Sequence, residues 1–184
     1  MRVITGSAKG THLKTLEGLD VRPTTDRVKE GMFSSIQFDL AGSTVLDLFA
    51  GSGQLGIEAL SRGAKQAVFV DHSPQAIKVI KENLEKTGFT SKAQVYQKES
   101  EQFFAYCPDR FFDFIFLDPP YRKDILQEIL PNLAKKIKES GKMICEHEKD
   151  LEMPEKILKL RLKKNYIYGK IVVSVYAFEE EESE

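Results

Sequence analysis

The sequence has few cysteines, few histidines and no long apolar run. Its two cysteines, Cys107 and Cys145, are too few for a disulfide framework and lack the spacing of a zinc site. The three histidines lie far apart, so no metal site is predicted. No apolar stretch approaches the roughly 20 residues of a membrane-spanning helix, and no signal-peptide core follows Met1. We therefore expect a cytoplasmic protein with reduced thiols, no metal and no membrane contact.

The length and composition are those of one domain. The chain has 184 residues, of which 41% are hydrophobic and 30% charged, as in ordinary folded proteins. Single cores usually grow to about 100–200 residues before they split. We expect an N-terminal extension over residues 1–40, a core over 41–178 and an acidic tail over 179–184. The tail has five glutamates and no base, and we expect it to be disordered because it lacks apolar residues.

The net charge of −1 hides an uneven distribution. Residues 1–29 carry six Lys/Arg against three acids, and residues 156–170 carry six Lys/Arg and no acid. Clustered bases at both ends of an otherwise acidic chain suggest a polyanionic partner. Solvated lysine-rich faces would also explain this charge pattern on its own.

Short apolar runs alternate with amphipathic stretches through the middle of the chain. Strands are predicted at 43–50, 65–71, 93–97, 112–118 and 142–148, and helices at 54–63, 73–88, 99–107 and 124–141, the last interrupted near Pro131. Ser73 as N-cap, Pro74 at the first helical position and Gly88 as terminator mark one helix clearly. Strands that alternate with helices predict βαβ units and a parallel sheet.

Both ends depart from this alternation. After residue 155, two runs of period 2 flank Gly169 and predict an antiparallel hairpin at the sheet edge. Before residue 40, we predict a small hairpin from residues 2–6 and 12–16, and a helix from about Thr25 to Phe38. The expected fold is α/β, with a mostly parallel sheet of seven strands, a C-terminal antiparallel hairpin and a small N-terminal hairpin plus helix.

A glycine loop follows the first strand of the core. Gly51, Gly53 and Gly56 match the spacing G-x-G-x-x-G between a strand and a helix. Glycine lets the backbone turn sharply, and the helix N-terminus offers free N–H groups. Asp71 follows Gly51 by twenty residues, at the position where a carboxylate can accept both hydroxyls of an adenosine ribose. The loop predicts an adenosine cofactor without choosing between a nicotinamide dinucleotide and S-adenosylmethionine.

Two carboxylates favour S-adenosylmethionine. Asp47 stands four residues before Gly51, where it would repel a pyrophosphate but suit a cationic ligand. Asp118 ends the strand predicted at 112–118 and should face the same crevice, because ligands of open α/β sheets bind at the strand C-termini. A charge-assisted hydrogen bond between such a carboxylate and the ammonium group of a cationic ligand contributes roughly 1.5–3 kcal/mol. No base for hydride chemistry is evident, which disfavours a dinucleotide-dependent oxidoreductase.

The tetrapeptide Asp118-Pro119-Pro120-Tyr121 suits the methylation of an exocyclic amine, whose lone pair is delocalised into its ring. The Asp118 carboxylate and the Pro119 carbonyl could accept both N–H bonds and draw the nitrogen toward tetrahedral geometry. Two prolines fix φ at about −65° and hold that carbonyl in place. Tyr121 offers a face on which a flipped base can stack, for about 1–3 kcal/mol. The alternative is a simple proline turn in which Asp118 caps the next helix.

Four segments of the chain resemble one known family. They are "LDLFAGSGQLGIEALSRGA", "VDHS", "FLDPPY" and "RPTTDRVKEGMF". Together they resemble bacterial 16S ribosomal RNA guanine-N2 methyltransferases. The resemblance covers nearly the whole chain, from "MRVITG" to "YGKIVVSVY". The resemblance implies the Rossmann-like class I fold of S-adenosylmethionine-dependent methyltransferases. It also implies S-adenosylmethionine as cofactor, a guanine N2 amine of 16S rRNA as acceptor, and ribosomal RNA or a small-subunit assembly intermediate as partner. We expect a monomer.

The resemblance and the motifs together assign the site residues. The expected cofactor contacts are Asp47, Phe49, Gly51, Gly53, Asp71, His72, Glu99 and Ser100. The chain has "KES" at 98–100 where the family more often has Gly-Asp-Ala, and His72 could instead be an exposed loop histidine. The expected substrate contacts are Arg2, Lys9, Arg22, Thr25 and Arg27, because phosphate contacts dominate affinity for RNA. Arg27 could alternatively pair with Glu30 on its own helix.

Other functions are also compatible with parts of the sequence. The same tetrapeptide serves DNA adenine-N6 and protein-glutamine methyltransferases, which act on other planar amines. A non-enzymatic RNA-binding module would explain the basic ends but would not explain the acid-Pro-Pro-aromatic turn.

Overall fold

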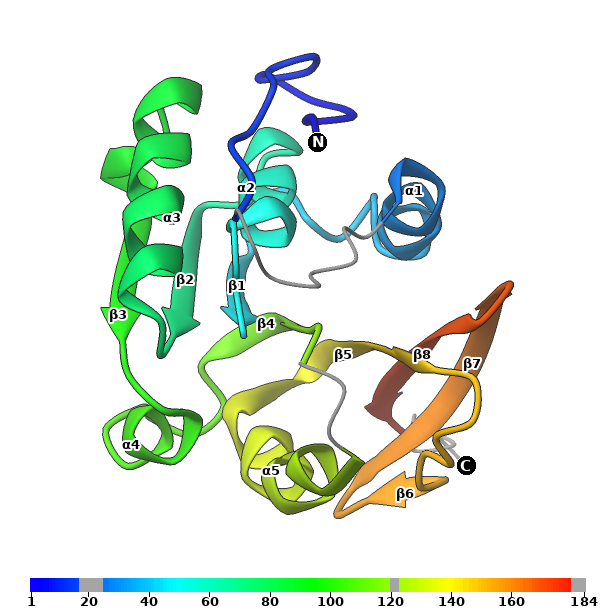
Figure 1. The fold of residues 1–184 in the computed structure, drawn as a ribbon. Helices are drawn as coiled ribbons and strands as arrows, with labels where there is room; N and C mark the ends of the chain where they lie inside the picture. Colours follow the sequence, from blue (N-terminus) through cyan, green and yellow to red (C-terminus); the bar gives the residue numbers. More distant parts are fainter. Residues whose placement is uncertain (17–24, 120–122, 180–184) are drawn as a thin grey trace.

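The computed structural model describes residues 1–16, 25–119 and 123–179, and within them eight strands form one sheet (Figure 1). The strands are β1 (Thr44–Leu48), β2 (Gln66–Asp71), β3 (Ala93–Gln97), β4 (Phe112–Leu117), β5 (Ile137–Glu148), β6 (Lys156–Ile157), β7 (Leu160–Tyr168) and β8 (Ile171–Phe178). Their order is β3-β2-β1-β4-β5-β8-β7-β6. Strands β1 to β5 pair in parallel, whereas β8, β7 and β6 pair antiparallel. The expected fold class is confirmed, and the strand beyond the expected seven is the short β6.

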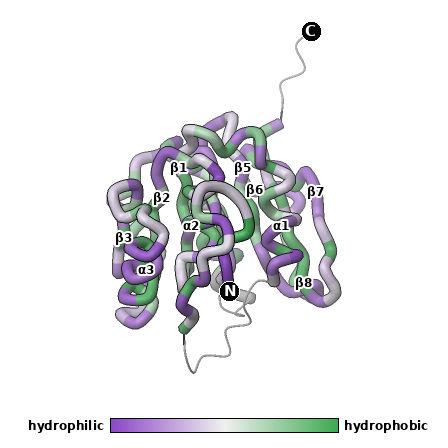
Figure 2. Tube along the Cα trace, turned by 90° about the horizontal axis from the view of Figure 1, so that it is seen from above, coloured by the Kyte–Doolittle hydropathy of each residue, from purple (hydrophilic) through white to green (hydrophobic). Residues whose placement is uncertain are grey.

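Helices cover both faces of the sheet. They are α1 (Asp26–Ser34), α2 (Gln54–Ser61), α3 (Pro74–Thr87), α4 (Ser100–Phe104) and α5 (Lys123–Lys136), with a 3₁₀ turn η1 (Thr90–Lys92). Figure 1 shows α1, α2 and α3 on one face and α4 and α5 on the other. Figure 2 shows hydrophilic stretches on α1, α3 and β7, toward the outside of the molecule. No helix in the described ranges is both long and apolar enough to cross a bilayer.

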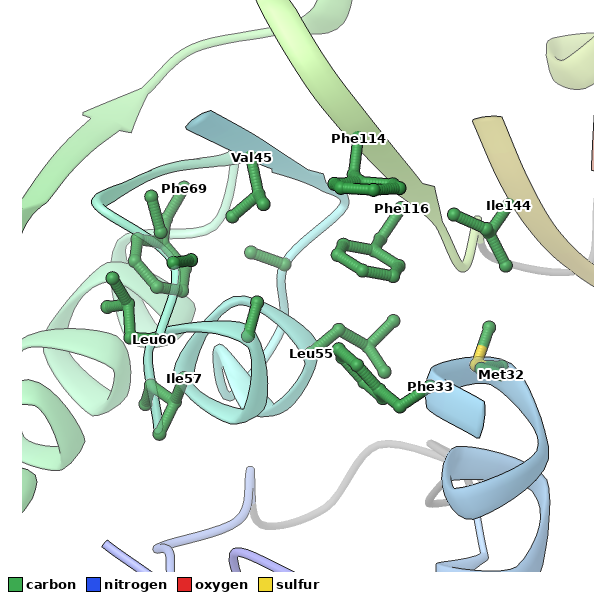
Figure 3. Close-up of a cluster of buried hydrophobic side chains, with 14 of the residues drawn as sticks. Met32, Phe33, Val45, Leu55, Ile57, Leu60, Phe69, Phe114, Phe116 and Ile144 are labelled. Carbon is green, nitrogen blue, oxygen red and sulfur yellow. The ribbon is translucent and has the colours of Figure 1, made fainter. Parts of the chain in front are cut away.

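The central strands are buried on both sides, as parallel strands covered by helices require. All five residues of β1 are buried. On the face of α1 and α2, the rings of Phe33 and Phe116 lie 5.1 Å apart between centroids, next to Met32 and Ile144 (Figure 3). Burial of one such side chain contributes roughly 1.5–3 kcal/mol. This packing fixes α1 above β4 and β5.

Helix ends follow the local signals in one case and not in another. Ser73 accepts a hydrogen bond from the Ala76 N–H, and Gly88 ends α3 with φ 75°, so both predicted ends of that helix are confirmed. Helix α1 begins after Thr25 but stops at Ser34, short of Phe38. The hydroxyls of Ser34 and Ser35 donate to main-chain carbonyls three residues back, and such bonds compete with helix continuation.

The largest difference from the predicted elements is the start of β5. The sequence pattern predicted helix up to residue 141, but α5 continues through Pro131, ends at Lys136 and passes directly into β5. Ile137 pairs with Phe112 before a shift in register. A Cβ on Gly141 would lie 2.7 Å from the carbonyl oxygen of Asp113. Contact with β4 therefore determines where β5 begins, and no local sequence signal predicts this start.

The predicted N-terminal hairpin is reduced to one antiparallel bridge between Arg2 and His12. Its main anchor is Glu58 on α2, whose oxygens accept hydrogen bonds from the Ile4 N–H at 2.9 Å and the Thr5 N–H at 3.1 Å. Lys29 of α1 donates to the Arg2 carbonyl at 2.6 Å and lies 3.5 Å from Glu58. Both side chains of this ion pair are fully buried. The segment is therefore held by helix side chains in addition to a short set of main-chain hydrogen bonds, in which the N–H groups of Val3, Gly10 and Leu13 donate to the carbonyls of Thr11, Val3 and Met1.

Candidate active site

The strand register brings four residues into one row at the carboxyl edge of the sheet. Residues in adjacent strands pair in the order Val70, Leu48, Leu117 and Cys145. The next residue on each strand therefore lies at this edge: Asp71, Phe49, Asp118 and Glu146. Because neighbouring strands lie about 4.8 Å apart, the backbone of Asp118 lies beside the first residue of the glycine loop.

The glycine loop has a left-handed backbone at three of its positions. Gly51 has φ 56° and Gly53, the N-cap of α2, has φ 78°. Phe49 also has a positive φ, of 62°, which costs a residue with a Cβ roughly 1–3 kcal/mol and is found mainly at functional sites. The Ala50 N–H donates to the Val70 carbonyl and ties this turn to β2.

Asp71 links the loop to the end of β2. One carboxylate oxygen accepts from the Gly51 N–H at 2.9 Å and the other from the Ser73 N–H at 2.9 Å. Each oxygen has a further lone pair, so the side chain can accept ligand hydroxyls while it holds the loop. His72 extends outward, with a 61% exposed side chain, and its Nδ1 lies 3.7 Å from Asp71.

Asp47 lies beneath the loop. Its carboxylate is 2% exposed and accepts a hydrogen bond at 2.8 Å from the N–H of Gly56, in the first turn of α2. Burial raises the pKa of Asp47 to about 8, against the opposing effect of the Gly56 bond, and the negative charge of Asp71 raises it further. Asp47 thereby supports α2, and its contact with a cofactor stays a prediction.

Two polar side chains of this region were not foreseen from the sequence. Asn83 on α3 donates to the Ser52 carbonyl at 2.9 Å and exchanges two hydrogen bonds with the backbone of Lys14. It thereby joins the glycine loop to the N-terminal segment. The Oε1 of Gln54, the first residue of α2, is buried and has no hydrogen-bond partner among the described residues. A polar residue on the buried side of an amphipathic helix is the only sequence signal for Asn83.

The first two residues of the predicted acid-proline turn lie at the carboxyl end of β4. Asp118 and Pro119 follow β4 directly and are both partly buried. Pro120 and Tyr121 lie outside the described residues, so the second proline and the stacking ring stay predictions. Asp118 thus lies one strand away from the glycine loop, at the edge where Asp71 also lies.

The connection after β3 reaches the same edge. The Lys98 N–H donates to the carbonyl of Asp71 at 3.1 Å. Glu99 is exposed at the N-cap of α4, and Ser100 is buried as the first residue of that helix. The structure therefore brings Glu99 and Ser100 near Asp71, as a contact with an adenine would require.

The expected substrate residues are only partly brought together. Arg2 pairs with Asp26 at 3.1 Å, and Thr25 caps α1 by accepting from Val28. Arg27 is exposed, and Arg22 lies outside the described residues. Lys9 is exposed in a turn whose Ser7 N–H donates to Ser61, the last residue of α2. Because α2 is about 12 Å long, Lys9 lies at the far end of the helix from the glycine loop.

Neither thiols nor metal ligands gather at this edge. Cys107 and Cys145 are unpaired, and burial raises the pKa of both thiols. In the described ranges, no three His, Cys, Asp or Glu side chains are grouped so that they could hold a metal ion.

Comparisons with known proteins agree with this arrangement. Residues 1–177 match the model of the family described as Conserved hypothetical protein 95. The chain is 42% identical over 180 residues, 96% of this chain and 98% of the relative, to the Bacillus subtilis protein named "Putative rRNA methyltransferase YlbH". It is 35% identical over 154 residues, 82% of this chain and 80% of the relative, to Ribosomal RNA small subunit methyltransferase D of Haemophilus influenzae.

A solved structure resembles the whole fold. The protein named "Putative methyltransferase yhhF from Escherichia coli" superposes with a TM-score of 0.86 at 30% identity, covering 98% of this chain and 99% of its own. The match by the family model and the identity to these relatives both extend over most of the chain. The chain therefore belongs to the Conserved hypothetical protein 95 family, and the family resemblance that its four sequence segments predicted is confirmed.

Proposed function

We propose that this protein is an S-adenosylmethionine-dependent methyltransferase that acts on the exocyclic N2 amine of a guanine in 16S ribosomal RNA. One observation carries the proposal: the register of β2, β1 and β4 brings Asp71, the glycine loop and Asp118-Pro119 to one edge of the sheet. This juxtaposition supports the proposal because it brings the candidate amine-binding residues Asp118 and Pro119 within one strand spacing of the candidate nucleoside-binding loop. The methyltransferase names of the relatives support it.

The residues present fit S-adenosylmethionine. Asp71 keeps acceptor capacity for ribose hydroxyls, and the buried Oε1 of Gln54, which has no hydrogen-bond partner among the described residues, is a further acceptor next to the loop. Burial raises the pKa of Asp47 to about 8, so this carboxyl should repel a pyrophosphate less strongly than an ordinary aspartate would. The acids proposed to face the ligand are Asp71 and, across the loop, Asp118. When bound, S-adenosylmethionine supplies a methyl group activated by a sulfonium.

The turn would activate the acceptor. The Asp118 carboxylate and the Pro119 carbonyl accept hydrogen bonds from the two N–H groups of the amine, which localises the nitrogen lone pair toward the methyl carbon. The amine nitrogen would accept the methyl group that S-adenosylmethionine supplies, and one amine proton would leave to Asp118 or to water. Tyr121 would stack against the extruded base, which must leave its helix to reach the edge.

The test is transfer of a labelled methyl group. Purified protein and tritiated S-adenosylmethionine are incubated with unmodified 16S rRNA, with small subunits lacking the modification, with DNA and with protein. Mass analysis of nuclease digests should then find N2-methylguanosine in the RNA arm or the particle arm. Label in adenine-N6 of DNA, or in a glutamine side chain, would replace this proposal with the corresponding methyltransferase.

The cofactor is tested separately by thermal stability. A ligand at 100 times its Kd stabilises the folded state by about 2.7 kcal/mol. S-adenosylmethionine should therefore raise the melting temperature, whereas a nicotinamide dinucleotide should not. A shift with the dinucleotide alone would favour an oxidoreductase, and RNA binding without any cofactor effect would favour a non-enzymatic module.

A further inference from the structure

The C-terminal hairpin carries a concentration of positive charge that the proposed site does not use. Residues 156–170 contain six Lys/Arg and no acid, and all six of these side chains are exposed. Arg161 pairs with Glu179. The five lysines, which are Lys156, Lys159, Lys163, Lys164 and Lys170, form no ion pair with a carboxylate in the described part of the chain.

The register places part of this charge close to Asp118. Leu117, Cys145, Ser174 and Asn165 pair in sequence across β4, β5, β8 and β7. The next residue on β7, Tyr166, therefore lies in the same row as Asp118, three strand spacings away. At about 4.8 Å each, this is about 14 Å, or about four nucleotides of a stacked strand at 3.4 Å per nucleotide.

Lys164 lies on a definite side of the sheet. Lys164 pairs with Val175, which packs in the core on the α1 face, so Lys164 points to that face as well. Its Nζ lies 4.7 Å from the centroid of the Tyr166 ring. The acid-rich segment 148–155 packs Leu151 and Met153 on the opposite face. An anion that approaches on the α1 face would therefore meet Lys164 before it meets the acids of segment 148–155.

The edge of β7 is accessible at the same place. Strand β6 pairs only with Leu160 and Arg161, so among the described residues no strand covers β7 from Leu162 to Tyr168. Lys163 is the extra residue at the register shift between Leu162 and Lys164. Lys170 follows Gly169 in the two-residue turn between β7 and β8. Its carbonyl accepts a hydrogen bond from the Lys149 N–H, at the carboxyl end of β5.

We propose that Lys163, Lys164 and Lys170 form an RNA-binding surface that holds the phosphates of the substrate strand beside the target guanine. The inference rests on the proposed function, because it takes the extruded base at Asp118 as the point from which the strand continues. The positive charge of these lysines favours a polyanion as the ligand. Their distance from Asp118 indicates that this polyanion is the RNA strand that contains the target guanine. The exposed lysines contribute affinity without sequence preference.

Two double variants of equal charge separate this surface from diffuse attraction. K163Q/K164Q removes two charges near the row of Asp118. K156Q/K159Q removes two charges on β6 and in the turn before β7. Lys156 lies opposite Arg161 and Lys159 precedes Leu160, so these charges lie about 17–23 Å from the row of Asp118 along the strand, at about 3.3 Å per residue. Filter binding of unmodified 16S transcript, without cofactor, should show about a tenfold weaker Kd for K163Q/K164Q and less than a twofold change for K156Q/K159Q.

Salt dependence gives a second readout that a folding defect would not reproduce. Each lost phosphate contact lowers the slope of log Kd against log salt by about 0.7 for a single strand, so K163Q/K164Q should lower the slope by about 1.4. In the methylation assay the KM for RNA should rise by the same factor as Kd. The kcat and the thermal shift with S-adenosylmethionine should stay at wild-type values.

The outcomes distinguish this inference from the proposed function. Equal weakening in both double variants, or no RNA binding by the wild type at low salt, overturns the inference. So does unchanged Kd with new dimers or aggregates of K163Q/K164Q in light scattering, because the lysines would then only guard an open strand edge. If binding changes as expected but no guanine N2 is methylated, the proposed function fails and the RNA-binding surface stands.

Discussion

The buried carboxylate of Glu58 allows a stringent test of how the N-terminal segment is held. The change Glu58→Gln keeps the size of the side chain and removes its charge. Its oxygens serve the N–H groups of Ile4 and Thr5, the Arg62 Nε at 2.8 Å and the nearby Lys29 ammonium. A glutamine has one acceptor oxygen and an NH2 group that would face donors. Several buried donors would therefore lose their acceptor at once.

The expected loss of stability is large. Removal of one member of a buried ion pair costs about 3–5 kcal/mol, and no discount for solvent applies because Lys29 and Glu58 are both 0% exposed. For a chain of about this length, 1 kcal/mol corresponds to about 2–4 °C. The melting temperature of E58Q should therefore fall by about 6–20 °C.

The pH dependence has a definite sign. Burial lowers the pKa of Lys29 from its ordinary 10.5, and the negative charge of Glu58 partly opposes this effect. Without Glu58 the pKa of Lys29 falls further. Between that lowered pKa and 10.5 the unfolded chain binds more protons than the folded one, so stability increases with pH in this window. The deficit of E58Q relative to wild type should thus shrink from pH 7 to pH 10.

Urea unfolding at both pH values measures these quantities. The control is E82Q, which breaks the exposed ion pair of Glu82 with Lys14 and should change stability little. The double variant K29M/E58Q should recover part of the loss, because an apolar side chain of similar length leaves no buried charge. A loss below about 1 kcal/mol for E58Q, or a deficit that grows with pH, would falsify this account of the segment's anchor.

Three further predictions concern the site and the core. D118A should lower methyl transfer by at least about 10²-fold while the thermal shift with S-adenosylmethionine is retained; undiminished transfer would remove Asp118 from the mechanism. In G56A the new Cβ would lie 2.3 Å from the fully buried Phe69 ring, so overpacking of about 1–3 kcal/mol should outweigh a helix-propensity gain of about 1 kcal/mol; urea unfolding that shows a more stable variant would contradict this. Burial lowers the pKa of His147, whose Nε2 lies 2.7 Å from the Ser174 hydroxyl, so stability should fall as the pH drops below 6.5, and H147Q should flatten that part of the unfolding free-energy curve; an unchanged curve would contradict it.

Local signals predicted the elements whose ends depend on their own residues. Ser73 and Gly88 define α3 because an N-cap hydroxyl and a left-handed glycine act within one turn. The central strands were predicted because burial on both faces leaves continuous apolar runs. The proximity of Asp71, the glycine loop and Asp118 follows in turn from the rule that parallel strands share a carboxyl edge.

Features that depend on distant neighbours could not be predicted in the same way. The start of β5 is set by contact between Gly141 and the backbone of β4, some 28 residues earlier in the chain. The bond from the Gly56 N–H to the Asp47 carboxylate depends on the packing of α2 over β1, which no local sequence signal gives. The roles of Glu58 and Asn83 depend on an N-terminal segment that they themselves hold in place.

The strand order also has a consequence for synthesis of the chain. Strand β8 is the last of these strands in the chain but lies between β5 and β7. Strands β7 and β6 therefore cannot join the sheet until β8 has paired with β5. A nascent chain in which β8 is still inside the ribosomal tunnel would present the open side of β5 to solvent. Loss of β8 by a premature stop would detach β8, β7 and β6 from the sheet at once, so its effect would be far larger than the number of residues removed suggests.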